Sequence, residues 1–174
     1  MRKFFVNRMP HRQKPSTRQK RRRLSMPETM DIKLKMNSIE LRKDLLQAME
    51  SSDFIGKAES ITENLEEEGA GLEAVVGILR FMEEHPAFDF GTPGPLAHFV
   101  ERFYGRGYEP ELLASITRKP TSHTLWLLNR IINGTKQPGE RVRLVSKLQE
   151  AERNPVADQH AKRLATHFLQ RLSS

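Results

Sequence analysis

Residues 72–85 read LEAVVGILRFMEEH, and this stretch decides the fold. Its apolar residues are spaced so that they cover nearly the whole circumference of a helix. A helix that is apolar on almost every face must be surrounded by other elements, so we expect it at the centre of the molecule. Pro86 ends it, because proline cannot continue the helical hydrogen bonding. The apolar residues concerned are Val75, Val76, Ile78, Leu79, Phe81 and Met82.

Two helices are predicted before this stretch. The helical period begins at Met36, where Asn37 and Glu40 have the spacing of an N-terminal capping pair. The next helix follows Ser51-Ser52 and is stopped by glycines, Gly69 and Gly71. The side chains expected to face inward are Leu41, Leu45, Ala48 and Met49 in the first helix and Phe54, Ala58, Ile61 and Leu65 in the second.

Five further helices are predicted after Pro86. Thr92 is expected to cap the first, with Pro93 at its first position, and Asn154-Pro155 is expected to begin the last. Between them we expect a short helix over 111–118, one that starts at Thr121 or Ser122 and ends at Asn133-Gly134, and one over 138–153. The side chains predicted to be buried include Leu96, Phe99, Val100, Phe103, Tyr104, Leu112, Leu113, Ile116, Leu125, Trp126, Leu127, Leu128, Ile131, Ile132, Leu144, Val145, Leu148, Ala151, Ala157, Ala161, Leu164, Phe168 and Leu172.

These patterns predict an all-α fold of about eight short helices. No segment alternates apolar and polar residues as a half-buried strand does. Short connections make consecutive helices antiparallel neighbours, so the helices should stack as hairpins. Stacked hairpins of this length are typical of an α-solenoid or of a compact bundle. The chain shows no repeat of fixed period, and its sequence leaves both arrangements open.

The first 35 residues differ from the rest of the chain. They lack a hydrophobic period, and Arg, Lys, Gln, Pro and Ser dominate them. Such a segment buries too little apolar surface to offset the cost of ordering its backbone. We therefore predict a disordered basic segment over 1–35 and a single helical domain over 36–174. Met26, Met30 and Met36 leave open whether the upstream part belongs to the native protein or reflects a wrongly assigned start.

Charge is distributed unevenly along the chain. The net charge of +7 is made up of about +10 over residues 1–35, −10 over 36–101 and +7 over 102–174. The body is therefore acidic in its first half and basic in its second. Blocks of one sign steer partners that carry the opposite sign.

Composition excludes several classes of protein. The chain has no cysteine, which rules out disulfides, a cysteine nucleophile and cysteine-ligated metals, and which fits a reducing, cytoplasmic location. It contains no run of about 18 apolar residues, so no membrane-spanning helix is expected. The start of the chain is too short in apolar residues for a secretory signal.

Two stretches resemble a known kind of protein. Residues 88–101 read FDFGTPGPLAHFVE, and residues 118–130 read RKPTSHTLWLLNR. Together they resemble small all-helical, HEAT-like immunity proteins that are found beside bacterial polymorphic toxins. The resemblance covers roughly residues 36–174 and leaves the basic segment outside. It implies a HEAT-like fold and a function in which the protein binds its cognate toxin and blocks it.

Few residues indicate catalysis or metal binding. His98 and His123 are expected to bond to neighbouring loops, and His160 and His167 are too far apart on one helix to share a metal. Glu83, Glu84 and Asp89 are expected to form a solvated acidic rim, since no nucleophile or phosphate-binding loop accompanies them. Trp126 is expected in the core. We therefore expect no enzyme activity, no metal and no cofactor.

The acidic half is the predicted partner-binding surface. Glu63, Glu66 and Glu67 belong to the densest acidic run, and a surface of this kind suits a basic partner such as a nuclease toxin. The loop before Pro95 adds Phe90 as an apolar anchor. We predict partner contacts at Glu63, Glu66, Glu67, Asp89, Phe90 and Glu101.

Nucleic-acid binding is the rival function. The basic segment would attract phosphates, but it has no aromatic residue after Phe5 on which bases could stack. The acidic block beside it would oppose nucleic acid. We therefore expect a protein partner, with nucleic acid only through the basic segment, and no membrane partner.

Overall fold

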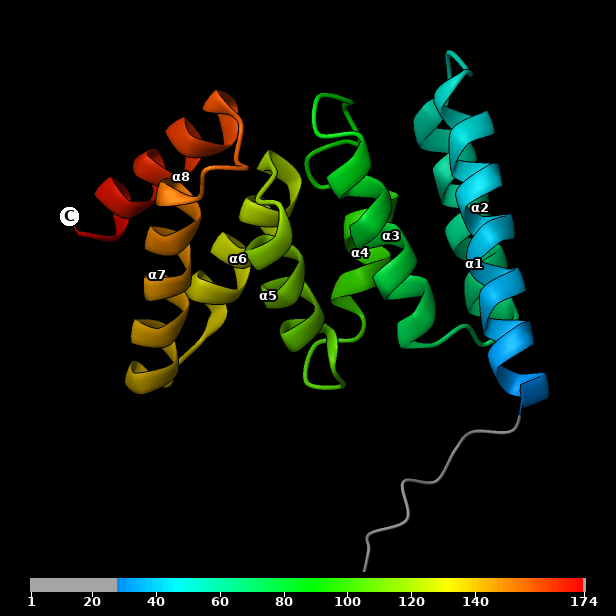
Figure 1. Cartoon of the computed structure of the whole chain (residues 1–174), viewed down its shortest axis with the longest axis horizontal. Helices are drawn as coiled ribbons and strands as arrows, with labels where there is room; N and C mark the ends of the chain where they lie inside the picture. Colours follow the sequence, from blue (N-terminus) through cyan, green and yellow to red (C-terminus); the bar gives the residue numbers. More distant parts are fainter. Residues whose placement is uncertain (1–27, 174) are drawn as a thin grey trace, which may run out of the picture.

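The computed structural model describes residues 28–173, with side chains from Ser38 onward. Within these residues the chain forms eight α-helices and no strand, which confirms the predicted all-α class (Figure 1). They are α1 (Glu28–Met49), α2 (Phe54–Glu67), α3 (Leu72–Glu84), α4 (Pro95–Glu101), α5 (Tyr108–Arg118), α6 (Ser122–Gly134), α7 (Pro138–Arg153) and α8 (Gln159–Leu172).

The helices form two layers of stacked hairpins. One layer contains α1, α3, α5 and α7, and the other contains α2, α4, α6 and α8. Every principal contact joins helices of one hairpin or of adjacent hairpins, which is the contact pattern of an α-solenoid. Figure 1 shows the hairpins following one another along the long axis, from α1 and α2 at one end to α7 and α8 at the other.

The first helix begins earlier than the sequence pattern indicated. α1 starts at Glu28, and neither Gly nor Pro interrupts residues 28–49. Asn37 lies inside this helix, so the predicted capping pair with Glu40 is wrong. Residues 28–35 of the predicted disordered segment are helical, because residues of good helix propensity such as Lys and Leu extend the helix upstream. Residues 1–27, which hold most of the basic segment, lie outside the described residues.

Side-chain caps mark several helix starts. Asp53, Thr121 and Asp158 each accept a hydrogen bond from a backbone amide in the first turn of α2, α6 and α8. The predicted cap at Thr121 is confirmed, and it forms a capping box with Thr124. Two other predicted starts are wrong, at Thr92 and at Asn154.

Both errors have the same cause, a turn that intervenes before the helix. α4 begins at Pro95 with Gly94 as its N-cap, since the turn between Gly91 and Gly94 comes first. Asn154 ends α7, and its side chain accepts a hydrogen bond from the amide of Val156. The last helix therefore starts only after Asp158.

The core is centred on α3, as predicted. This helix buries seven of its residues and packs against α1, α4, α5 and α6. Most predicted core residues are buried or half-buried, but Tyr104 and Trp126 are exposed. Tyr104 lies beyond the end of α4 at Glu101, in the turn that leads to Tyr108. None of the helices within residues 28–173 is both long enough and apolar enough to cross a membrane.

Candidate functional site

A cavity of about 140 Å³ lies in the second layer, between α4 and α6. With seven residues α4 is roughly 10 Å long, about half the length of α2 or α6. Its principal contacts are with α2 and α3, so part of the α6 surface is left uncovered. We call this space the α4–α6 cavity, and it is lined by Met82, Phe90, Gly91, Thr92, Pro93, Ala97, His123, Trp126, Leu127 and Arg130.

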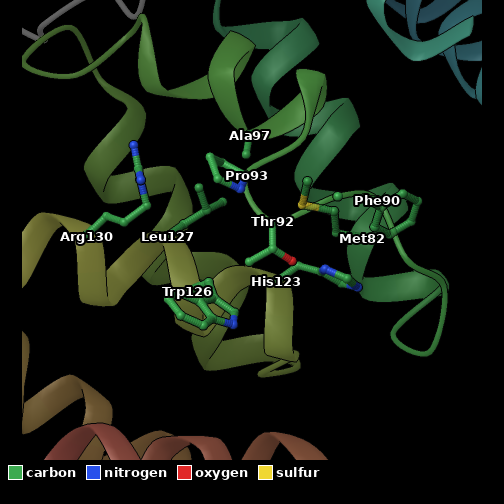
Figure 2. A pocket seen from close by; sticks show the side chains of 10 residues that line it. Met82, Phe90, Thr92, Pro93, Ala97, His123, Trp126, Leu127 and Arg130 are labelled. Atoms are coloured by element: carbon green, nitrogen blue, oxygen red, sulfur yellow. The ribbon is translucent and has the colours of Figure 1, made fainter. Parts of the chain in front are cut away.

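The loop before α4 forms one wall of this cavity. Gly91 has a positive φ of 85°, and its amide donates to the Asp89 carboxylate at 2.9 Å. A side chain at Gly94 would collide with the Phe90 carbonyl oxygen. These constraints hold a tight turn that leaves Thr92 and Pro93 at the surface, facing Trp126 and Leu127 across the cavity (Figure 2).

Phe90 anchors this loop in the core. Only 1% of its surface is exposed. Its ring centroid lies 5.6 Å from that of Phe54, 5.9 Å from that of Phe81 and 4.7 Å from that of His123. The prediction that Phe90 is an exposed anchor for a partner is therefore wrong, because rings from α2, α3 and α6 enclose it. Phe88 in the same loop is half-buried.

One face of α6 forms the opposite wall. His123, Trp126, Leu127 and Arg130 follow the spacing of a single helical face, and all four line the cavity. Trp126 is 40% exposed, and its ring meets that of Phe168 on α8 edge to face at 5.0 Å. The prediction of a core tryptophan is wrong, because the short α4 does not reach across it. The spacing of these four residues was the sequence signal that could have located the site.

An ion pair closes one end of the cavity. Both oxygens of Glu101, the last residue of α4, accept hydrogen bonds from the Arg130 guanidinium, one of them at 2.9 Å. The carboxylate raises the pKa of Arg130. Beyond this pair lies a second, open hollow, lined in part by Tyr104 and by Tyr108, whose pKa is raised by burial. Glu101, predicted as a partner contact, is therefore already engaged within the chain.

The remaining predicted acidic contacts are on or near α2. Glu63 and Glu67 are exposed and continue the row begun by Glu59 at four-residue intervals; we call these three residues the acidic row. Glu66 pairs with Arg102, which follows α4. Asp89 is exposed and supports the turn at Gly91. Of these residues Asp89 is bonded to the loop wall of the cavity, whereas Glu66 pairs beyond the other end of α4 and the acidic row runs along α2.

Glu83 and Glu84 do not form the predicted solvated rim with Asp89. Glu83 is 7% exposed, and its carboxylate accepts hydrogen bonds from Arg118 at 2.8 and 3.3 Å. Glu84 pairs with Arg42 of α1 at 2.9 Å. These carboxylates link neighbouring hairpins, since α3 packs against both α1 and α5. Their role is structural.

The histidines are placed separately. His98 is exposed on α4, and His160 and His167 are exposed on α8. Within the part of the chain that the structure describes, no group of three or more His, Asp or Glu side chains is arranged to hold a metal ion. His123 is largely buried, and this burial lowers its pKa; the backbone at Phe88 and Pro86 and the charge of Asp89 oppose the shift.

The lowered pKa of His123 predicts a pH-dependent stability. As the pH falls through about 6.5, the unfolded chain takes up a proton at this residue before the folded chain does, so the free energy of unfolding decreases. Between about pH 7.5 and pH 5.5 the wild type should lose more stability than His123→Gln, as measured by urea denaturation. His98→Gln is the control and should follow the wild type. Equal slopes for the wild type and His123→Gln would contradict the prediction.

The structure brings together the two stretches that carried the family resemblance. Apart from Met82, every residue that lines the α4–α6 cavity comes from residues 88–101 or 118–130. The ion pair between Glu101 and Arg130 and the ring contact between Phe90 and His123 join the same two stretches. They are therefore the two sides of one site. No protein-family model, curated protein or solved structure matches this chain.

Proposed function

We propose that this protein is a non-catalytic binding protein that neutralises a cognate bacterial toxin by direct contact. The face that carries the contact consists of α2, the loop wall and α6. The observation that carries the proposal is Trp126, a half-exposed tryptophan at the edge of an apolar cavity on a rigid helical scaffold. Tryptophan is strongly enriched among the residues that dominate the energy of protein interfaces.

Neighbouring apolar groups extend this face. Ile55 of α2 is exposed, and its side chain lies beside Gly91 of the loop. Thr92 and Pro93 continue the exposed surface toward Trp126. The loop is held by the buried Phe90 below it, so it loses little conformational entropy when a partner binds. A preformed apolar centre with a polar surround is the usual arrangement of a protein interface.

The acidic row supplies the polar surround on the α2 side. Like charges at four-residue spacing destabilise a helix, and neither Glu63 nor Glu67 forms an ion pair among the described residues. A row that costs stability while facing solvent is suited to a basic partner, such as a toxin that binds nucleic acid. Such charges mainly accelerate association and reject wrong partners.

Charge reversal tests this assignment. The double variant Glu63→Lys/Glu67→Lys should slow association with the cognate toxin domain by about 10-fold at low salt, and the difference should shrink as salt screens the charges. Association rates at two salt concentrations give the result, and protection of cells that express the toxin gives the biological readout. A circular-dichroism melt should show intact folding.

The matched control is Glu40→Lys/Asp44→Lys on α1. These two exposed acids have the same four-residue spacing and their reversal changes the net charge equally, but they lie in the other layer. We expect wild-type association for this control. If both double variants behave alike, or if only reversal of Arg143 and Lys147 on α7 abolishes protection, the partner binds elsewhere and the assignment is wrong.

A further inference from the structure

The α4–α6 cavity has the size of a single aromatic ring. Apolar cavities of about 150 Å³ are known to hold one benzene molecule, and this one measures about 140 Å³. Side chains from three helices and the loop, including Met82, Ala97 and Leu127, form its apolar lining. Trp126 and Phe90 offer ring edges and faces, which favour an aromatic occupant over an aliphatic one of equal volume.

The charges around the cavity favour positive flanking residues on the occupant. Arg130 is the cation in the lining, and Glu101 neutralises it through two hydrogen bonds. Burial keeps the pKa of His123 low, so this side chain is neutral at physiological pH. Asp89, Glu63 and Glu67 remain as exposed carboxylates without an ion pair among the described residues. Asp89 is bonded to Gly91 of the loop wall, so its negative charge lies at the cavity, whereas Glu63 and Glu67 lie on α2, on the other side of α4.

We propose that the α4–α6 cavity is the receptor for one aromatic side chain of the partner, presented on a segment whose flanking residues are lysine or arginine. The aromatic ring inserts between Pro93 and Ala97 on one side and Trp126 and Leu127 on the other. A flanking cation faces Asp89, and the acidic row on α2 contributes a negative field from farther away. This inference rests on the proposed function, because it names the chemistry of the partner at that site.

Tryptophan fluorescence can follow the binding of an aromatic side chain in the cavity. Trp126 is the single tryptophan of the chain and lines the cavity, so selective excitation of tryptophan reports on the surroundings of this one side chain. The probe is the blocked tripeptide acetyl-Lys-Phe-Lys-amide, which contains no tyrosine or tryptophan. Titration of the full-length protein should give a saturable shift of the emission to shorter wavelengths, with a dissociation constant on the order of 1 mM. The peptide acetyl-Lys-Ala-Lys-amide should give none.

A cavity-filling variant provides the structural control. Ala97→Met places a longer side chain in the cavity without removing an existing contact, and it should weaken probe binding at least about 10-fold. Ala114→Met makes the same change at a half-buried position in α5, away from the cavity, and should bind as the wild type does. Absence of a saturable shift up to about 10 mM, or equal binding by Ala97→Met, would overturn the proposal.

The flanking charges are tested separately. At low salt acetyl-Lys-Phe-Lys-amide should bind about 3- to 10-fold more tightly than acetyl-Glu-Phe-Glu-amide, and the ratio should fall as salt is added. Equal affinities would contradict the assignment of a basic segment. Protection of cells from the toxin distinguishes failure of the receptor role of the cavity from failure of the proposed function. If Ala97→Met loses the probe but still protects cells, the receptor role is wrong and the proposed function stands. If the wild type fails to protect, the proposed function is wrong, whatever the peptides show.

Discussion

Replacing Phe90 with alanine should lower the free energy of unfolding by about 3–5 kcal/mol, the range observed when a fully buried phenylalanine is truncated. The ring is 1% exposed and lies within 6 Å of the rings of Phe54, Phe81 and His123. Its removal leaves a cavity between three helices and frees the base of the loop. Urea denaturation followed by circular dichroism measures the effect, and the melting temperature should fall by roughly 2–4 °C per kcal/mol.

The control for this prediction is Phe88→Ala. Phe88 lies in the same loop and contacts Phe54 at 4.9 Å, but it is only half-buried, so its truncation should cost distinctly less. A Phe90→Ala protein with wild-type stability and faster dissociation from its partner would restore the view of Phe90 as an exposed anchor. Our expectation is that any loss of binding by this variant follows its loss of folded protein.

Replacing Trp126 with alanine should weaken toxin binding strongly and lower the free energy of unfolding less than Phe90→Ala does. Truncation of a central interface residue typically costs about 2–4 kcal/mol of binding energy, which corresponds to a toxin affinity roughly 30- to 1000-fold weaker. Dissociation should become faster while association changes little, since the steering charges on α2 remain. Stability should fall less than in Phe90→Ala, because the indole is 40% exposed. Binding kinetics give the association and dissociation rates, and urea denaturation of the same preparation gives the free energy of unfolding.

Two variants test the specificity of this effect. Trp126→Phe retains an aromatic ring and should recover part of the affinity. Val142→Ala truncates a side chain that is 70% exposed on α7 and should leave both affinity and stability near wild type. If Trp126→Ala binds the toxin as tightly as the wild type, the α4–α6 cavity is not at the centre of the interface.

The helices could be predicted from the sequence because the features that form and end a helix lie within a few residues of one another. Hydrophobic periodicity and the residues that start or stop helices predicted α2, α3, α6 and α7 to within a few residues. In particular, α7 begins at Pro138 as expected. Helix-forming periodicity, proline at a first turn and glycine after a last turn all act within a few residues of the chain. The predicted starts failed where a turn had to be distinguished from a cap, at Thr92 and Asn154, since both structures use the same residue types.

Only part of the candidate site could be predicted from the sequence. The sequence singled out the loop before Pro95, and in the structure this loop forms one wall of the cavity. The sequence assigned the wrong burial to two aromatic residues of the site, however. The phenylalanine of the loop, Phe90, was predicted at the surface and is buried, whereas the tryptophan of the helix, Trp126, was predicted in the core and is exposed. Charge patterning placed Glu63 and Glu67 at the surface but not the ion pairs of Glu66 and Glu101.

The sequence by itself determined that this protein is all-helical, that α3 lies at its centre and that its body is acidic first and basic second. These properties follow from the spacing and charge of residues that are close together in the chain. Only the tertiary structure decided which apolar residues are covered. The exposure of Trp126 depends on how far α4 extends, and the burial of Phe90 depends on rings supplied by α2, α3 and α6. Burial is set by neighbours that are distant in sequence, so helical period can show which face is apolar but not what packs against it.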